Sequence, residues 1–384
     1  MTEFVEGNRI TLLTGGGEYF PALETECDAA RHEIHIETYI FEDDVAGLRI
    51  AAALKRAAQR GVATHLLVDG YGSRKLSPAL AAGMQSAGVR LHVYRPDIAP
   101  WTFQRQRLRR MHRKLAVIDA RVAFVGCINI IDEMHTPGQT PPRFDYAVRI
   151  EGPLLRSIHP VVKKLWALVE FTQFGQDWHQ RTLLQADHAP RGRQRAAFVV
   201  RDNLRHRRDI EEAYLAAIAG ARSEILIASS YFFPGVGFRR ALVEAAARGV
   251  RVVLLLQGRV EYVLPHYAAQ GLYDELLREG VEIVQYRRSF LHAKVAVIDD
   301  RATVGSSNID PFSLLLAREA NIFVNDRAFA QELRQRIERL IAEGGEALQL
   351  VHHRRRPLLV RLFNRFALLV MRVGVAITGM GQGY

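Results

Sequence analysis

Residues 112–119 read HRKLAVID and residues 292–299 read HAKVAVID, so one short motif occurs in each half of the chain. Behind the polar start of each copy, residues 115–118 and 295–298 are apolar without interruption and rich in branched side chains. Such runs are typical of strands that are buried on both faces. The duplicated motif therefore predicts two matching strands at corresponding places of an internal repeat.

The polar residues at the start of each copy predict an active site. Side chains alternate between the faces of a strand, so His112 lies on the same side as Lys114, and His292 on the same side as Lys294. A single His-x-Lys at the mouth of a strand is usually only a solvated pair. Two copies with the same apolar run and the same final aspartate instead favour one composite site, to which each half contributes a proton-transferring ring beside a positive charge.

A glycine and an asparagine follow each copy at matching places: FVGCIN ends at Asn129, and TVGSSN ends at Asn308. Glycine lets the backbone approach a ligand closely, and the two asparagine amides can donate hydrogen bonds to an oxyanion. Asp119 and Asp299 close the motifs on the opposite strand parity from the histidines, so we expect them to brace loops or lysines. Between the aspartate and the glycine lie six residues in the first copy and five in the second.

The pattern H-x-K-x4-D followed by G-S-x-N, present twice, resembles that of the phospholipase D superfamily, and the flanking sequence is similar to its bacterial cardiolipin synthases. The similarity covers most of the chain and includes residues 36–41 (IETYIF) and 230–234 (SYFFP). Cys127 departs from the pattern, which usually has Ser or Gly there. The resemblance implies an α/β protein of two phospholipase D-like repeats, each a mixed β-sheet flanked by helices, packed as a pseudo-dimer with the active site between them.

The order of the expected elements is the same in both halves. Strand-like residues 33–41 and 224–233 each lead to an alanine-rich helix, an Arg-Gly-Val turn and a further strand. Strands that alternate with helices predict layered α/β domains with largely buried sheets. We expect a first domain at residues 1–172 and a second at 204–346, with the polar segment 173–203 as either a linker or an ordered crossover against one sheet.

These residues suit phosphodiester exchange, which needs a nucleophile, an acid for the departing oxygen and positive charge around the phosphate. With an unperturbed pKa of about 6.5, one imidazole can be neutral while its twin is protonated. Lys114 and Lys294, with Asn129 and Asn308, can surround the phosphoryl oxygens as preorganised donors. We expect no cofactor and no metal ion, because no Cys/His cluster has metal-ligand spacing and the lysines would repel a cation.

The resemblance assigns roles that the symmetry of the motifs leaves open. It implies that His112 attacks phosphorus to form a phosphohistidine, and that His292 acts first as an acid and then as a base. Each ring also needs an acceptor that fixes its tautomer. Matching downstream positions predict Asp145 as the partner of His112 and Glu319 as the partner of His292.

The composition favours a polyanionic partner. The formal net charge of +11 suits nucleic acid or an anionic membrane surface, and charge alone does not choose between them. The chain has two cysteines, which excludes a disulfide framework and suits a reducing compartment. The acidic N-terminus lacks the basic and apolar regions of a signal peptide, so we expect the protein to face the cytosol.

Residues 351–384 form a tail of different composition. From residue 358 to residue 380 the tail is apolar except for three arginines, an asparagine and a threonine. At about 100° per residue, Arg365 and Arg372 lie about 40° and 20° from Arg361, which makes one narrow basic stripe. Each arginine would cost about 2.5–3.5 kcal/mol at a bilayer centre, so we expect a basic amphipathic helix in the membrane interface. The alternative is a terminal helix docked on the protein or on another subunit.

The favoured function is cardiolipin synthesis, in which a phosphatidyl group passes from phosphatidylglycerol to the headgroup hydroxyl of a second phospholipid. The alternative is a phospholipase D-type hydrolase or a nuclease, with water as acceptor; a non-enzymatic membrane scaffold is least favoured, because both motifs are intact. The expected partners are anionic phospholipids, namely phosphatidylglycerol and cardiolipin, and the membrane surface. The apolar tail disfavours nucleic acid, and the oligomeric state stays open. The expected location is the cytoplasmic face of the cell inner membrane, as a peripheral or monotopic protein.

Overall fold

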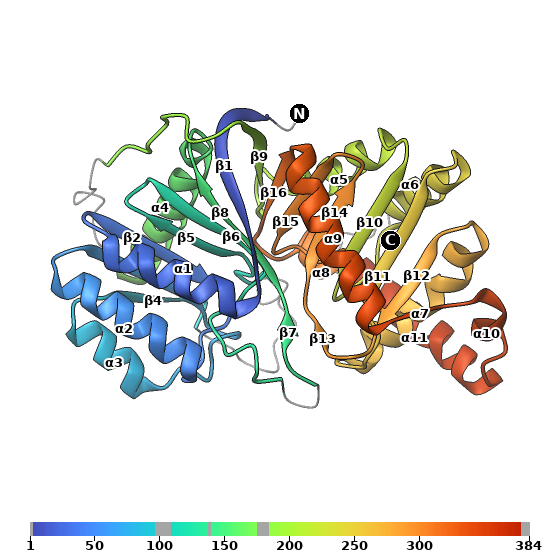
Figure 1. Ribbon diagram of the computed structural model, residues 1–384. Coiled ribbons are helices and arrows are strands. Elements are labelled where there is room, and N and C mark those ends of the chain that lie inside the picture. Colours follow the sequence, from blue (N-terminus) through green and yellow to red (C-terminus); the bar gives the residue numbers. More distant parts are fainter. Residues whose placement is uncertain (1–2, 97–108, 137–139, 175–183, 378–384) are drawn as a thin grey trace.

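Strands and helices alternate along the chain in a computed structural model that describes residues 3–96, 109–136, 140–174 and 184–377 (Figure 1). The elements of the first half are β1 (Val5–Thr14), α1 (Gly15–Ala29), β2 (Glu33–Thr38), α2 (Val45–Gln59), β3 (Ala63–Asp69), α3 (Pro78–Ser86), β4 (Arg90–Tyr94), β5 (Lys114–Ile118), β6 (Val122–Gly126), β7 (Arg143–Phe144), β8 (Tyr146–Glu151) and α4 (Leu155–Phe174).

The second half repeats most of this order, but its short strand β13 precedes the motif hairpin, α8 is added, and a C-terminal extension follows. Its elements are β9 (Gln194–Arg201), α5 (Asp209–Ala219), β10 (Glu224–Ser229), α6 (Val236–Ala247), β11 (Arg251–Gln257), α7 (Val263–Arg278), β12 (Glu282–Tyr286), β13 (Phe290–Leu291), β14 (Lys294–Ile298), β15 (Arg301–Gly305), α8 (Pro311–Leu315), β16 (Glu319–Asn325) and α9 (Arg327–Gly344). The extension holds β17 (Gly345–Ala347), α10 (Leu350–Arg354) and α11 (Leu358–Ile377).

One sheet of 15 strands runs through both halves in the order β17-β12-β11-β10-β14-β15-β16-β9-β1-β8-β6-β5-β2-β3-β4. Apart from β17 at the edge, the order reads the same from either end when each strand is exchanged for its counterpart, with β1 matching β9. The halves are joined where β1 pairs antiparallel with β9. The predicted α/β fold of two matching repeats, each with mixed strands flanked by helices, is confirmed, and the strands of both repeats join into this one sheet.

The segment between the predicted domains contains part of this joint. Within residues 173–203, Gln194–Arg201 forms β9, which pairs with β16 on one side and with β1 on the other. The preceding residues 175–183 lie outside the described residues. The domain limits at 172 and 204 stay predictions.

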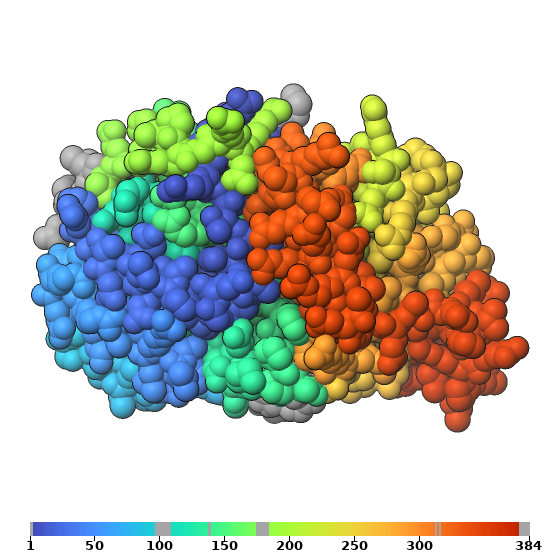
Figure 2. Space-filling view, in the orientation of Figure 1, coloured from blue at the N-terminus to red at the C-terminus, as the bar shows by residue number. Residues whose placement is uncertain are grey.

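The buried strands follow from helices on both faces of each sheet. Every residue of β2, β5 and β14 is buried, which explains why the motif strands are apolar without alternation. In Figure 1, α1, α2 and α3 cover one face of the first half, and α9 lies against the second half near the joint. Figure 2 shows α9 in orange between the blue first half and the yellow-green part of the second half.

The sheet bends so that the two halves share a core. Strands β6 and β8 contact β15 and β16, and one apolar cluster contains residues of both, including Val125, Val148, Val304 and Ile322. The ends of β5 and β14 that carry the motif histidines therefore approach one another from opposite halves.

The unequal spacing of the two motif tails is absorbed far from these ends. In the first half Ile118 pairs with Val122 across the β5–β6 turn, whereas Ile298 pairs with Arg301 across the β14–β15 turn. The extra residue of the first copy thus lies in the hairpin turn, where Ala120 has a positive φ of 49°.

Candidate active site

The two motif histidines stand immediately before β5 and β14, and each is fixed by backbone of the other half. Met111 makes an isolated bridge to Arg318, and the His112 N–H donates to the carbonyl of Arg318 at 3.0 Å. In the matching place, β13 pairs with β7 and the His292 N–H donates to the carbonyl of Phe144 at 2.9 Å. Both rings are consequently held at the interface between the halves.

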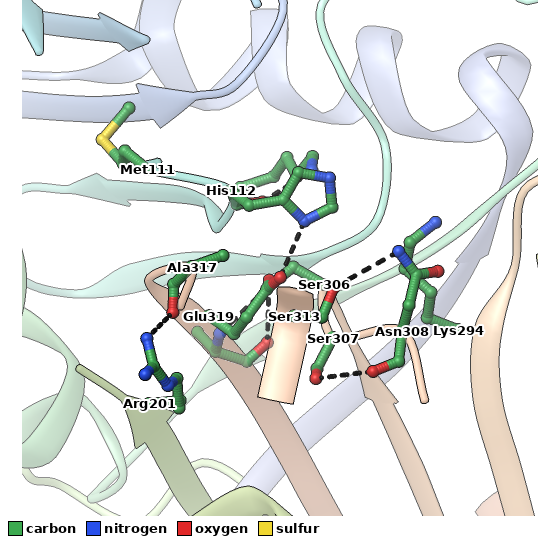
Figure 3. Close-up of polar contacts among 12 residues, drawn as sticks. Met111, His112, Arg201, Lys294, Ser306, Ser307, Asn308, Ser313, Ala317 and Glu319 are labelled. Atoms are coloured by element: carbon green, nitrogen blue, oxygen red, sulfur yellow. Dashed lines mark hydrogen bonds and ion pairs between the residues drawn. The ribbon is translucent and has the colours of Figure 1, made fainter. Parts of the chain in front are cut away.

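The carboxylates that hold the two rings are exchanged between the halves. His112 Nδ1 lies 2.8 Å from Glu319 Oε1 (Figure 3), and His292 Nδ1 lies 2.6 Å from Asp145 Oδ1. The prediction that paired Asp145 with His112 and Glu319 with His292 is wrong. It assumed that each half completes its own histidine, whereas β7–β13 pairing and the bridge at Arg318 carry each acid across to the opposite ring.

This arrangement leaves the second nitrogen of each ring for chemistry. Because Nδ1 is bound to a carboxylate, Nε2 is the nitrogen that can meet a substrate. The His112 side chain is 17% exposed and that of His292 10%, whereas Glu319 and Asp145 are buried. Burial lowers the pKa of both histidines, the paired carboxylate opposes this, and nearby lysine charge adds to it. A bound phosphodiester anion would raise the pKa of both rings again.

The two motif lysines are buried beside the rings. Lys114 Nζ donates to the carbonyl of His112 at 2.6 Å, and Lys294 Nζ donates to the carbonyl of His292 at the same distance. Lys294 also donates to Ser230 Oγ at 3.1 Å. Burial lowers the pKa of Lys114 to about 7, and it lowers the pKa of Lys294 as well. An anion bound nearby would stabilise the charged form of each buried lysine, so the site favours a negatively charged substrate.

The two asparagines are buried close to these groups. Asn129 Oδ1 accepts a hydrogen bond from the N–H of Ile40 at 3.1 Å. Asn308 Oδ1 accepts from Ser230 Oγ at 2.9 Å, and its amide nitrogen donates to Ser313 Oγ at 3.4 Å (Figure 3). Ser230 joins Asn308 to Lys294, which fixes the amide beside a cation. The role of both asparagines toward phosphate stays a prediction.

The motif aspartates lie at the other ends of the motif strands. Asp119 accepts hydrogen bonds from the N–H groups of Arg31, His32 and Glu33 at 2.7 to 3.0 Å. Asp299 does the same for the matching loop before β10. The expected bracing of loops is confirmed. Their inclusion among the catalytic candidates is corrected, because the five residues of each motif strand lie between the aspartate and the histidine that begins the motif.

Ser306 is a neighbour of the site that the sequence analysis did not single out. It directly follows β15, and its hydroxyl donates to Glu319 Oε2, while the N–H of Ala320 donates to Ser306 Oγ at 3.0 Å. The signal was present, because Ser306 occupies the same place after the glycine as Cys127 in the first half.

Tyr39 is a second missed neighbour. Its ring centroid lies 4.9 Å from that of His112, and Lys114 Nζ lies 5.3 Å from the same centroid. Tyr39 belongs to the stretch IETYIF, which carried the family resemblance without a stated role. Its ring thus covers one side of the first histidine–lysine pair.

The donor set around the rings is cationic rather than metal-binding. Among the residues that the structure describes, no group of three or more His, Cys, Asp or Glu side chains is arranged to hold a metal ion. The positive charge beside the rings comes from Lys114 and Lys294, and their role toward phosphate stays a prediction.

Sequence comparison identifies the family. The profile described as "Cardiolipin synthase, PLD-like domain" matches residues 23–138 and 214–341, one segment in each half. The chain belongs to the phospholipase D-like cardiolipin synthase family. Within this family, cardiolipin synthase B of Escherichia coli (strain K12) is 43% identical over 339 residues, which cover 88% of this chain and 81% of that protein. Probable cardiolipin synthase YwiE of Bacillus subtilis (strain 168) is 30% identical over 365 residues, covering 94% and 71%.

Solved structures share the fold of this cardiolipin synthase family member. A phosphatidylserine synthase of Haemophilus influenzae Rd KW20 superposes with a TM-score of 0.70 at 12% identity, over 97% of this chain and 95% of that one. A polyphosphate kinase of Porphyromonas gingivalis superposes with a TM-score of 0.59 at 14% identity, over 89% and 49%. At these identities the likeness concerns the fold alone.

Proposed function

We propose that this protein is a cardiolipin synthase that transfers a phosphatidyl group from phosphatidylglycerol to a hydroxyl of a second phospholipid. The observation that carries the proposal is the pair of rings, His112 and His292, each bound through Nδ1 to a buried carboxylate of the other half. Family membership directs this two-histidine chemistry toward phospholipids. Lys114 and Lys294 would offset the charge of the phosphodiester.

In the first step, His112 Nε2 attacks phosphorus, and the bond from phosphorus to the glycerol oxygen breaks. His292 gives its Nε2 proton to that oxygen, so glycerol leaves and a phosphatidyl-histidine remains. Glu319 stabilises the His112 ring as it becomes positively charged. The assignment of His112 as the nucleophile comes from the resemblance to the superfamily.

In the second step, a headgroup hydroxyl of another phosphatidylglycerol attacks the same phosphorus. His292, now neutral, accepts the proton of this hydroxyl while the bond between phosphorus and His112 Nε2 breaks. The product is cardiolipin, and the protons return to their starting places. Asp145 steadies His292 in both protonation states.

The C-terminal helix supports association with a membrane surface. Helix α11 packs on α7 through buried residues that include Ala367 and Met371, yet its other side exposes Leu359 by 79% and Phe366 by 58%. Taking about 100° per residue, the stripe of exposed arginines lies between the protein-facing side and the exposed apolar side. Helix α11 therefore combines both expectations for the tail, since it docks on the protein and still presents an apolar face.

We infer that this face lies in the membrane interface, with the arginines at the level of anionic headgroups. No helix among residues 3–96, 109–136, 140–174 and 184–377 is long and apolar enough to cross a bilayer. Residues 378–384 of the predicted tail lie outside the described residues. A peripheral or monotopic location on the cytoplasmic face of the inner membrane, with phosphatidylglycerol and cardiolipin as partners, fits these features.

The test is mass spectrometry of the lipids formed when the purified full chain meets phosphatidylglycerol vesicles. We expect cardiolipin and free glycerol in equal amounts, and no cardiolipin from His112→Ala or His292→Ala. Quenching the wild type with detergent at neutral to alkaline pH, where the phosphorus–nitrogen bond survives, should trap phosphorus on His112. Release of phosphatidic acid without cardiolipin would instead establish a hydrolase, the alternative named above, and label on a serine would contradict the phosphohistidine scheme.

A further inference from the structure

The residues that follow β6 and β15 occupy equivalent places but differ in chemistry. The N–H of Cys127 donates to the carbonyl of Tyr146 at 2.9 Å, and the N–H of Ser306 donates to the carbonyl of Ala320 at 3.0 Å. In return, the N–H of Tyr146 donates to Cys127 Sγ at 3.1 Å and the N–H of Ala320 donates to Ser306 Oγ at 3.0 Å. The backbone frame is therefore the same, and both side chains are fully buried.

The two side chains differ in what they offer the adjacent carboxylate. The Ser306 hydroxyl donates directly to Glu319, on the oxygen that does not bind His112. The Cys127 thiol donates to the carbonyl of Tyr146 at 3.1 Å and also interacts with Asp145. Burial, followed by the charge of Asp145, raises the pKa of Cys127 to about 12, so the thiol stays protonated and neutral.

This difference changes how strongly each carboxylate holds the proton of its histidine. A hydroxyl that donates to a carboxylate makes a strong charge-assisted hydrogen bond and takes up part of the negative charge. A thiol is a weak donor and leaves that charge in place. Through this contribution alone, Glu319 is the weaker support for a charged ring and Asp145 the stronger one. Burial still lowers the pKa of His292 to about 3 in the free enzyme, so the difference between the two donors acts once a bound phosphate anion has raised the pKa of both rings.

We propose that Cys127 and Ser306 are positioning residues that give the two histidines their different roles. The weak donor Cys127 leaves most of the charge of Asp145 to His292, which holds the proton. The strong donor Ser306 takes up part of the negative charge of Glu319, so His112 is the ring that stays neutral and attacks. This inference rests on the proposed two-histidine phosphatidyl transfer and adds the reason why similar motifs take unlike parts in it.

Other charged side chains lie near the same two rings and change how readily each ring is protonated. Lys114 and Lys294 oppose protonation of His112, and Lys294 and Arg143 oppose protonation of His292. Arg143 thus works against the effect of Cys127. Exchanging the side chains at 127 and 306 keeps these charges constant and isolates the contribution of the two donors.

The experiment compares Cys127→Ser and Ser306→Cys with the wild type in the full chain. The first measurement is the pH dependence of kcat for cardiolipin formation in phosphatidylglycerol vesicles, since kcat reports the groups of the substrate complex. Cys127→Ser should move the alkaline limb, where His292 loses its proton, to lower pH by about 0.5–1 unit. Ser306→Cys should move the acid limb, where His112 gains a proton, to higher pH by about the same amount.

The second measurement is independent of lipid turnover. Histidine ring signals of isotope-labelled protein are titrated by NMR in the presence of inorganic phosphate, with His112→Ala and His292→Ala used to assign the two rings. Cys127→Ala serves as a further variant, because it removes the thiol without adding a stronger donor and should not lower the proton affinity of His292. It keeps the test open if the buried hydroxyl of Cys127→Ser prevents folding.

The outcomes separate this inference from the proposed function. Unchanged limbs together with unchanged NMR titrations in both exchange variants would overturn the inference while leaving cardiolipin synthesis intact. A shift of the acid limb by Cys127→Ser, or of the alkaline limb by Ser306→Cys, would also overturn it. Absence of cardiolipin with the predicted NMR shifts would refute the proposed function and retain the assignment of the two rings.

Discussion

At the scale of single residues, the exchange of carboxylates between the halves decides how the histidines work. The proposed mechanism needs each Nδ1 proton to be held so that Nε2 is left for phosphorus, and the acid bound to each Nδ1 comes from the other half. A carboxylate contributes charge as well as an acceptor. Removing the charge while keeping the size of the side chain separates these two contributions.

We therefore expect Glu319→Gln and Asp145→Asn each to lower kcat by about 10²–10⁴-fold, with a smaller change in KM. The amides keep an acceptor but no longer stabilise a charged ring. Asp119→Asn is the matched control, because this carboxylate accepts from the N–H groups of residues 31–33 at the start of β2, and the variant should retain most of the activity. Steady-state kinetics on phosphatidylglycerol vesicles would check this, and equal losses in all three variants would contradict it.

Lys114 provides a pH dependence at the same scale. Its pKa of about 7 means that the free enzyme loses this positive charge as the pH rises above 7. Because the charge attracts the phosphodiester, kcat/KM should fall on the alkaline side. Bound phosphate raises the lysine pKa, so loss of this charge should limit kcat/KM and not kcat, whose alkaline limb is assigned to His292.

Lys114→Arg tests this expectation because a guanidinium stays charged throughout the range. The alkaline fall of kcat/KM in this variant should move to higher pH, even if the rate itself is lower. A profile that falls at the same pH as that of the wild type would assign the decline to another group.

At the scale of elements, the sequence predicted the repeated frame well but not its connections. The strand starts at Glu33 and Glu224 were placed correctly, because apolar runs bounded by turns are local signals. Both strands end earlier than predicted, at Thr38 and Ser229, since the residues that follow turn away to make isolated bridges. The short β7–β13 pair has two residues on each side and no pattern of its own, so the swap of Asp145 and Glu319 could not be read from spacing.

The exposed apolar face of helix α11 leads to a prediction about lipid binding. Replacing Phe366 and Leu369 together by Asp should weaken binding to phosphatidylglycerol vesicles by about 10-fold or more, because both side chains are exposed and lose apolar contact with lipid. The thermal midpoint should change little, since neither residue packs on α7. Vesicle flotation and a thermal melt measure the two effects.

The matched control for this pair is Leu204→Asp, a change at an exposed leucine in the segment between β9 and α5. It should leave flotation unchanged. Equal losses of flotation in the control and in the α11 variant would mean that added negative charge, and not the apolar face of the helix, weakens binding. Unchanged flotation of the α11 variant would show that the tail does not mediate membrane contact.

At the scale of the whole molecule, one chain contains both motifs, both carboxylates and the joint between β1 and β9. Because both histidines and both carboxylates meet within one chain, a complete site needs no second copy. A mixture of His112→Ala and His292→Ala proteins should consequently stay inactive, since every molecule in it lacks one ring.

The cardiolipin formed by an equimolar mixture of the two variants, relative to each variant alone, is the quantity to measure. Renewed activity on mixing would mean that rings from different chains combine, as in a site shared between subunits or an exchange of halves. Cross-linking of the mixture at the activity-assay concentration would then tell these two arrangements apart.

The reciprocal hold of each half on the ring of the other makes catalysis sensitive to how the halves are seated. A shift of an ångström or two at the shared core would detach both imidazoles in the same movement, because neither carries its anchor on its own side. Partial misalignment of the two halves would then give an inactive enzyme and not one in which a single step is impaired. Substitutions deep in the seam, far from any lipid, should accordingly mimic the loss of a reacting group.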